Sequence, residues 1–229
     1  MLFKKNAPYT IPIAITVFTL TLLVAYLVRN HTSSGKILIA VQHGDIAETT
    51  KILNKKPNLI NHRDNFYRGP LIYFAALKGN AEMVRLLLDF GADPDLTDKN
   101  GMTALHKAAI FNHLEVIRAL LQADADIEAK GLKYGKLHLT PLHLATEAGN
   151  LEAVRLLIES GADVQCQESN VSPLHMAAGL NNLEIVKLLI DQGAKVNARD
   201  WQDRTPLYWA SRTKSELVIE FLRKKGGVL

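Results

Sequence analysis

Three histidines at equivalent places in the chain are the side chains best suited to bind a metal ion or to transfer a proton. His106, His143 and His175 each follow a leucine in a short motif, L-H-x-A. A neutral imidazole is a common metal ligand, and it changes charge near neutral pH. Tyr73 and Tyr208 stand at the matching positions of two further motif copies, and tyrosine does not readily replace histidine as a metal ligand. The series therefore argues against a metal site.

Two pairs of carboxylates and one thiol are the remaining candidates for acid–base or nucleophilic chemistry. Asp93 with Asp95 and Asp124 with Asp126 are close in sequence, but they fall in polar turns, where solvated acids are expected. Cys166 is the only cysteine and has no obvious histidine or basic neighbour, so we expect an unreactive thiol. The chain contains no H-E-x-x-H, G-x-S-x-G or G-x-x-x-x-G-K motif. We therefore predict no enzymatic activity, no cofactor and no metal site.

The histidine motif belongs to a longer pattern that recurs about every 33 residues. Its clearest copy consists of Thr140-Pro141-Leu142-His143, Gly149-Asn150, Leu156-Leu157 and Gly161-Ala162-Asp163. The leucine position of successive copies is filled by Ile37, Ile72, Leu105, Leu142, Leu174 and Leu207. This pattern resembles the ankyrin repeat, a helix-turn-helix unit with a hairpin finger. The resemblance implies an all-α repeat solenoid of six ankyrin repeats, with structural histidines, over residues 36–66, 67–99, 100–135, 136–168, 169–200 and 201–229.

Residues at fixed places in the pattern predict where the helices begin and end. Hydroxyl side chains are expected to cap the first helix of four repeats, at Thr103, Thr140, Ser172 and Thr205. Left-handed residues are expected to end the second helix, at Gly91, Asp124, Gly161, Gly193 and Gly226. Paired alanines such as Ala108 and Ala109 let neighbouring first helices approach. The second helix of repeat one is polar and includes Thr49, which suits an end cap.

An uncharged segment near the N-terminus predicts one membrane-spanning helix. Residues 7–28 carry no charge, and their 22 residues at ~1.5 Å each could cross a hydrocarbon core of about 30 Å. A cleaved signal peptide is the alternative, but no small-x-small pair precedes Arg29. Lys4 and Lys5, in a short basic N-terminus of residues 1–6, favour a cytoplasmic N-terminus. The repeats would then lie in the periplasm or another extracytoplasmic compartment, joined to the anchor by a linker of residues 29–35.

The net charge of +4 does not mark a surface for nucleic acid. Lys4, Lys5 and Arg29 account for three of the 27 basic residues, which leaves 24 basic and 23 acidic residues in the repeat region. Both signs are mixed along every predicted helix, and no basic stripe is interleaved with aromatic residues. We therefore predict no nucleic-acid partner and no small-molecule substrate.

The resemblance to ankyrin repeats implies that a folded protein binds on the concave face and on the fingers. Apolar residues expected on that face, with packing between helices as the alternative, are Phe74, Leu77, Ile110, Phe111, Met176, Leu180 and Trp209. The third finger is longer than the others, and we expect it to form a flexible cationic tip without stacking contacts, unless it is a tolerated insertion. Its candidate contact residues are Lys130, Lys133, Tyr134 and Lys136. Trp201 in the fifth finger is a further candidate.

The layout of one N-terminal anchor and a short array also resembles bacterial ankyrin proteins that face the periplasm. This resemblance implies two narrower roles: an immunity protein against a secreted toxic effector such as a lipase, or an accessory factor for an enzyme such as catalase. We expect a non-enzymatic module that binds one protein and sequesters or inhibits it by steric occlusion. A scaffold for a membrane or envelope complex is the main alternative, and an enzyme is the third.

Overall fold

Twelve α-helices account for most of the described chain and follow one another in pairs. The computed structural model describes residues 32–64, 68–133, 137–167 and 171–229. The helices are α2 (Ser33–His43), α3 (Ile46–Lys55), α4 (Leu71–Leu77), α5 (Ala81–Asp89), α6 (Ala104–Ile110), α7 (Leu114–Gln122), α8 (Pro141–Glu147), α9 (Leu151–Glu159), α10 (Pro173–Gly179), α11 (Leu183–Asp191), α12 (Pro206–Arg212) and α13 (Glu216–Lys224). A short 3-10 helix, η1 (Pro57–Leu59), and two strands, β1 (Gly131–Lys133) and β2 (Leu137–Leu139), complete the described elements.

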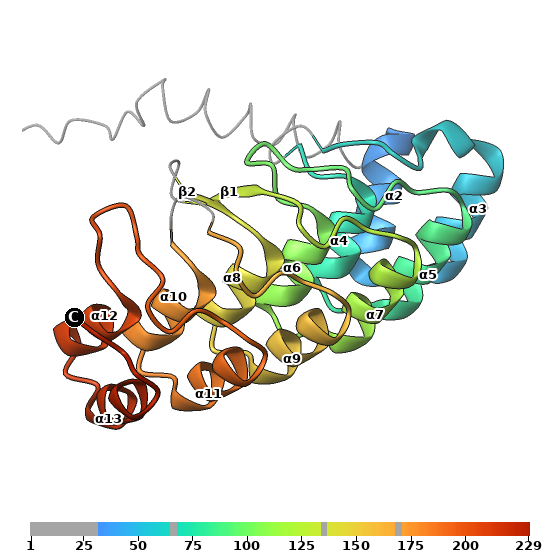
Figure 1. Cartoon of the computed structure of the whole chain (residues 1–229). Coiled ribbons are helices and arrows are strands. Elements are labelled where there is room, and N and C mark those ends of the chain that lie inside the picture. The colour runs from blue at the N-terminus through green and yellow to red at the C-terminus, as the bar shows by residue number, and fades with distance from the viewer. Residues whose placement is uncertain (1–31, 65–67, 134–136, 168–170) are drawn as a thin grey trace, which may run out of the picture.

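The even-numbered helices form one layer and the odd-numbered helices form another (Figure 1). Each even-numbered helix contacts the even-numbered helix of the next pair, and the odd-numbered helices contact one another in the same way. Small side chains allow the close approach within the even layer, because Ala75, Ala76, Ala108 and Ala109 are fully buried. The result is an all-helical solenoid in which the helix pairs pack chiefly against neighbouring pairs.

The predicted N-caps are confirmed at all four positions. Thr103, Thr140 and Ser172 each accept a hydrogen bond from the amide of the histidine three residues later, which satisfies a donor at the helix start. Thr205 accepts the equivalent hydrogen bond from the backbone amide of Tyr208. The capping residue therefore fixes the start of each of these helices at the position that the motif predicts.

The predicted left-handed residues after the odd-numbered helices from α5 to α13 are also confirmed. The glycines at positions 91, 161, 193 and 226 have φ between 83° and 99°, and Asp124 has φ 57° in the same place. A residue other than glycine in this region is strained, although aspartate tolerates it better than most residues. The chain therefore turns out of α5, α7, α9, α11 and α13 in the same manner, with a small local cost at Asp124.

Side chains in the loop after each odd-numbered helix accept hydrogen bonds from backbone amides of the next loop. We call this series the loop ladder. Its bonds join Asp93 N to Asn61 Oδ1 (3.1 Å), Asp126 N to Asp95 Oδ1 (2.8 Å), Asp163 N to Glu128 Oε1 (2.8 Å), Lys195 N to Gln165 Oε1 (3.2 Å) and Val228 N to Asn197 Oδ1 (2.9 Å). The loop ladder links every consecutive pair of loops from α3 to the C-terminal residues.

The third finger is more ordered than we predicted over its described part. Strands β1 and β2 pair in antiparallel fashion, with Gly131 opposite Leu139 and Leu132 opposite His138. The amide of Leu132 also donates to the carbonyl of Asn100 in the preceding finger, at 2.7 Å. The expectation of a finger without stacking contacts is therefore wrong for β1, because backbone pairing continues from one finger to the next. Tyr134 and Lys136 lie outside the described residues.

The predicted location of the repeats behind a membrane anchor requires correction. Among the residues that the structure describes, no helix is long and apolar enough to cross a membrane. This finding overturns the placement of the N-terminus in the cytoplasm and of the repeats in the periplasm. The segment on which that placement depended, residues 7–28, lies outside the described residues.

Two buried threonines have hydroxyl groups without a hydrogen-bond partner in the described part of the chain. Thr49 was expected to belong to a polar end-cap helix, but its side chain is fully buried. Thr146 stands in α8 where α6 and α10 have an alanine, and it is also fully buried. An unpaired buried hydroxyl destabilises the folded state by about 1–3 kcal/mol. Both threonines are therefore expected to lower the stability of the core.

Thr146→Val should raise the free energy of unfolding by about 1 kcal/mol, because it removes the unpaired hydroxyl and keeps the shape of the side chain. Thr140→Val is the matched control, since the same substitution removes a helix cap and should lower the free energy by about 1 kcal/mol. Urea denaturation measures both changes. A loss of stability in Thr146→Val would show that the hydroxyl makes a favourable hydrogen bond in solution.

Candidate functional site

The three motif histidines link each helix start to the finger that follows it. Nε2 of His106, His143 and His175 lies 3.0, 2.8 and 3.0 Å from the carbonyl oxygens of Leu139, Val171 and Arg204 respectively. A carbonyl only accepts, so Nε2 carries the proton, and Nδ1 accepts from the backbone amide of the capping residue. Both ring nitrogens are thus occupied by the fold. This confirms the structural role that the family resemblance implies.

Burial favours the neutral form of His106 and His175. Loss of hydration lowers the pKa of His106 to about 4, and burial also lowers the pKa of His175. Tyr73, at the histidine position of α4, instead donates its hydroxyl to Asp98 at 3.0 Å. Within the described ranges, no three His, Cys, Asp or Glu side chains are grouped so that they could hold a metal ion. The three motif histidines thus join helices to fingers and are fully buried.

Cys166 has a histidine neighbour that the sequence analysis missed. Its thiol is buried, and Sγ lies 3.7 Å from Nδ1 of His143 and 3.8 Å from the hydroxyl of Thr140. Cys166 lies in the loop after α9 and His143 in α8, 23 residues earlier, so the contact forms only in the folded helix pair. The Cys166 thiol is buried, so it belongs to the core and is not presented to solvent.

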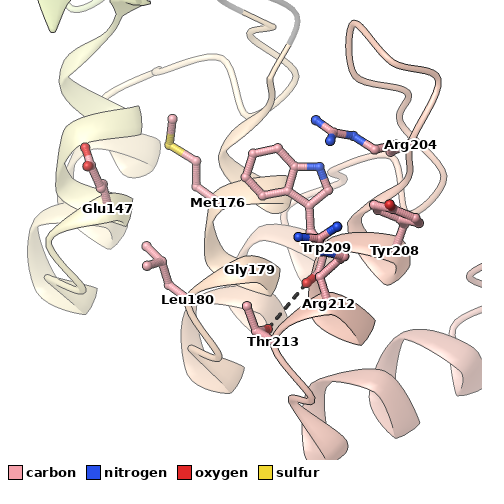
Figure 2. Close-up of a pocket in the computed structure, with 9 residues that line it drawn as sticks. All are labelled: Glu147, Met176, Gly179, Leu180, Arg204, Tyr208, Trp209, Arg212 and Thr213. Atoms are coloured by element: carbon pink, nitrogen blue, oxygen red, sulfur yellow. Dashed lines mark hydrogen bonds between the residues drawn. The ribbon is translucent and has the colours of Figure 1, made fainter. Parts of the chain in front are cut away.

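A cavity of about 480 Å³ opens between α8, α10 and α12 (Figure 2). Its apolar surface comes from Met176 and Leu180 of the α10 region and from Trp209 of α12. In Figure 2, Trp209 stands between these two residues on one side and Arg204 and Tyr208 on the other. The remaining lining residues are Glu147, Gly179, Arg212 and Thr213. This cavity, which we call the α10–α12 pocket, brings three of the predicted partner-binding residues together.

Trp209 is held in place by a buried carboxylate. Its indole Nε1 donates to Asp200 Oδ2 at 2.8 Å, and its ring makes an edge contact with His175, with ring centroids 5.8 Å apart. Asp200 also accepts from the backbone amides of Gln202 and Arg204, both at 2.9 Å, and forms an ion pair with the Arg204 guanidinium at 2.8 Å. The Trp209 indole, which forms the floor of the pocket, is therefore held in one orientation before a partner binds.

The charge of Asp200 depends on these hydrogen bonds. Burial by itself raises the pKa of a carboxyl group, but donors from Arg204, Trp209 and Gln202 outweigh it and lower the pKa of Asp200 to about 2. The guanidinium of Arg204 is in turn surrounded by aromatic rings, with its central carbon 5.2–5.7 Å from the ring centroids of Trp201, Tyr208 and Trp209. The Arg204 guanidinium is thus already paired with Asp200 and lies beside three aromatic rings.

A glycine explains why the pocket is hollow. Gly179 ends α10 at the position where the other even-numbered helices from α4 onward end in Leu77, Ile110, Glu147 and Arg212. A Cβ atom at Gly179 would lie 2.9 Å from Trp209 Cε3, which is closer than van der Waals contact allows. The missing side chain lets the indole lie against α10 and leaves space above it.

The other predicted partner-binding residues are spread over the array. Phe111 is 50% exposed beyond the end of α6, where its ring stacks on His113 at a centroid distance of 6.0 Å. Phe74 is only 5% exposed, so packing between helices describes it better than partner contact. Leu77 and Ile110 are partly buried against the core. Trp201 is exposed, as is Lys130 at the base of the third finger, whereas of Lys133 only the backbone is described, as part of β1.

Sequence reasoning missed several residues that line the pocket: Glu147, Gly179, Arg204, Tyr208, Arg212 and Thr213. Of these residues, only Gly179 could have been recognised from the sequence. Alignment of the motif copies shows a glycine where the five other copies have larger side chains, which indicates a hollow on that surface. The aligned positions do not show that the indole of the next copy would form its floor.

Comparison with known proteins finds one family over most of the chain. Family models described as "Ankyrin repeats (3 copies)" match residues 37–131 and 142–228, and one described as "Ankyrin repeats (many copies)" matches residues 105–158. These matches leave the predicted count of six repeats unconfirmed.

Three similar proteins each match less than half of the chain. An ankyrin repeat protein of Fowlpox virus is 32% identical over 94 residues, which is 40% of this chain and 21% of that protein. The E3 ubiquitin-protein ligase XBAT33 of Arabidopsis thaliana is 35% identical over 39% of this chain and 17% of its own length. SH3 and multiple ankyrin repeat domains protein 1 of Homo sapiens is 36% identical over 42% of this chain and 4% of its own length. This chain therefore spans about a fifth or less of these relatives.

Proposed function

Because the chain belongs to the ankyrin-repeat family, whose repeats form protein-interaction domains, we propose that it binds one folded protein on the face formed by the even-numbered helices. The binding would sequester the partner or inhibit it by covering its functional surface. The division of the array into six repeats is part of this proposal, as are contacts from Lys130, Lys133 and Lys136 to an acidic region of the partner.

One observation carries the proposal: two large apolar side chains at the same register position are exposed. Phe111 and Leu180 directly follow α6 and α10, and they are 50% and 53% exposed. Leu180 also lines the α10–α12 pocket. Exposed apolar groups next to a pocket are typical of protein interfaces, and a few buried anchors supply most of the binding energy of such an interface. The face from α6 to α12 thus has the features of a binding surface.

Phe111→Ala combined with Leu180→Glu should weaken partner capture by about 2 kcal/mol or more and leave the helical content unchanged, because both side chains lie outside the core. Leu217→Glu is the matched control: Leu217 is 65% exposed but belongs to α13, in the odd-numbered layer. Quantitative co-purification from the native source, with mass spectrometry, measures the capture. Equal loss of the partner in the Leu217 variant would argue against a specific face.

A scaffold that stabilises its partner is the alternative, and it uses the same surface. The two outcomes separate when the purified partner is titrated with this chain: inhibition shows as loss of the partner's activity, and scaffolding as retained activity with greater stability. The narrower roles, immunity against a toxic effector such as a lipase or assistance to a catalase, are tested by measuring binding to those two enzymes directly. The ligase activity named for the plant relative is not transferred, because this chain covers 17% of that protein.

A further inference from the structure

The α10–α12 pocket combines an apolar floor with one available positive charge. Met176, Leu180 and Trp209 supply the floor. Of the two arginines in the lining, Arg204 is paired with Asp200 at 2.8 Å. Arg212 is exposed at the end of α12 and has no carboxylate partner among the residues that the structure describes. Arg212 can therefore pair with an acidic group of a partner, whereas Arg204 is already paired.

Resting on the proposed function, we infer that the α10–α12 pocket binds an apolar side chain of the partner, and that an Asp or Glu next to that side chain pairs with Arg212. A partner segment with this composition buries its apolar group on Trp209 and Leu180 while its carboxylate remains at the rim. The charge on the segment selects its orientation, since Glu147 lies on the α8 side of the pocket and Arg212 on the α12 side (Figure 2).

Three features support a built site at this place. Asp200 fixes the indole of Trp209 through a 2.8 Å hydrogen bond, so the floor is preorganised. Gly179, which lines the pocket, leaves room for the indole, since a Cβ atom there would lie 2.9 Å from Trp209 Cε3. The volume of about 480 Å³ lies within the range of about 300–1,000 Å³ that is usual for ligand pockets. Other ends of even-numbered helices lack this combination, because Leu77 and Ile110 occupy the position of Gly179.

The test uses the full chain and a phage-displayed library of short linear peptides of random sequence. The unmodified chain should enrich peptides with an apolar residue within two positions of Asp or Glu. Arg212→Glu should weaken binding of the selected peptides about tenfold and should instead enrich peptides with Lys or Arg at the acidic position. Arg223→Glu, an exposed site on α13, is the matched charge control and should change neither result.

A second variant tests the hollow itself. Gly179→Leu introduces the residue found at the equivalent place in α4 and should weaken binding of the same peptides tenfold or more. Circular dichroism checks the fold, and Arg212→Glu carries the test if Gly179→Leu does not fold. Enrichment of the same acidic motif by Arg212→Glu, or of no motif by the unmodified chain, would overturn the inference. So would a dimer of this chain that Arg212→Glu abolishes, because a second copy would then be the occupant.

The same variants distinguish failure of the pocket inference from failure of the proposed function. If Gly179→Leu and Arg212→Glu capture the native partner normally while the Phe111 and Leu180 variant does not, the face binds the partner but the pocket does not. If none of the three variants changes capture, the proposed face itself is wrong.

Discussion

His106→Ala should lower the free energy of unfolding by about 3 kcal/mol, because both ring nitrogens make buried hydrogen bonds. The substitution leaves the Leu139 carbonyl without its donor at 3.0 Å and opens a cavity between α6 and the third finger. His43→Ala is the control, since that ring is exposed and bonds only within its own helix. Urea denaturation followed by circular dichroism measures both variants. Equal effects in the two would contradict a special role of the buried position.

The same histidine should make the protein sensitive to mild acid. Its pKa is about 4 in the folded state and about 6.5 when exposed, so the unfolded chain binds the proton more readily. The folded state is therefore destabilised as the pH falls from 6.5 to 4, by about 3 kcal/mol at the lower end. Denaturation midpoints across this window measure the loss. The part due to His106 should be absent in His106→Ala, and an unchanged pH dependence in that variant would contradict the assignment.

Asp200→Ala should lower the free energy of unfolding by about 3 kcal/mol, since it leaves the Arg204 guanidinium and the Trp209 indole without their shared acceptor. Asp203→Asn is the control, because Asp203 lies three residues away and is exposed, its Oδ2 is 3.7 Å from Arg199 Nη1, and asparagine tolerates the left-handed backbone of this position, φ 60°. Loss of this charge should change stability by less than about 1 kcal/mol. Trp fluorescence should shift in Asp200→Ala and not in Asp203→Asn, because the indole of Trp209 loses its anchor. A stable Asp200→Ala with unchanged fluorescence would contradict this account.

The ionised form of Asp200 is the stabilising one, and this sets the direction of its pH dependence. A folded-state pKa of about 2, below the ordinary value of 3.8, means that its contribution is fully present above pH 3.8. The contribution is lost as the pH falls from 3.8 to 2, and it amounts to about 2 kcal/mol. The pH dependence of the free energy of unfolding should therefore differ between the parent protein and Asp200→Asn only in this range, which lies below the window assigned to His106.

Features that depend on residues close in sequence could be predicted. The cap at Thr140 bonds to the amide of His143, three residues later, and Asp124 adopts the left-handed conformation that its place in the pattern predicts. The contact between Cys166 and His143 could not be predicted in this way, because it joins α8 to the loop after α9, 23 residues later in sequence. Phe74 and Phe111 were both candidates for the partner surface, and only the packed structure shows that the first is buried and the second exposed.

The pocket was only partly predictable for a related reason. Met176, Leu180 and Trp209 stood out as apolar residues at surface positions, and the structure brings them together. The depth of the pocket depends on an absent side chain at Gly179, and its rigidity depends on Asp200, which reaches Trp209 from the fifth finger. Composition and periodicity describe which residues are present in each repeat. They do not describe the space left between two repeats.

The loop ladder makes the coupling between neighbouring units one-sided. Each of its bonds needs a suitable side chain from the first loop but only a backbone amide from the second, and every residue except proline carries that amide. The acceptors accordingly vary among Asn, Asp, Glu and Gln without any matching change in the residue that donates. A unit can therefore be duplicated, deleted or exchanged in this region without a compensating substitution in the unit that follows, which is a condition for an array to change its length by recombination.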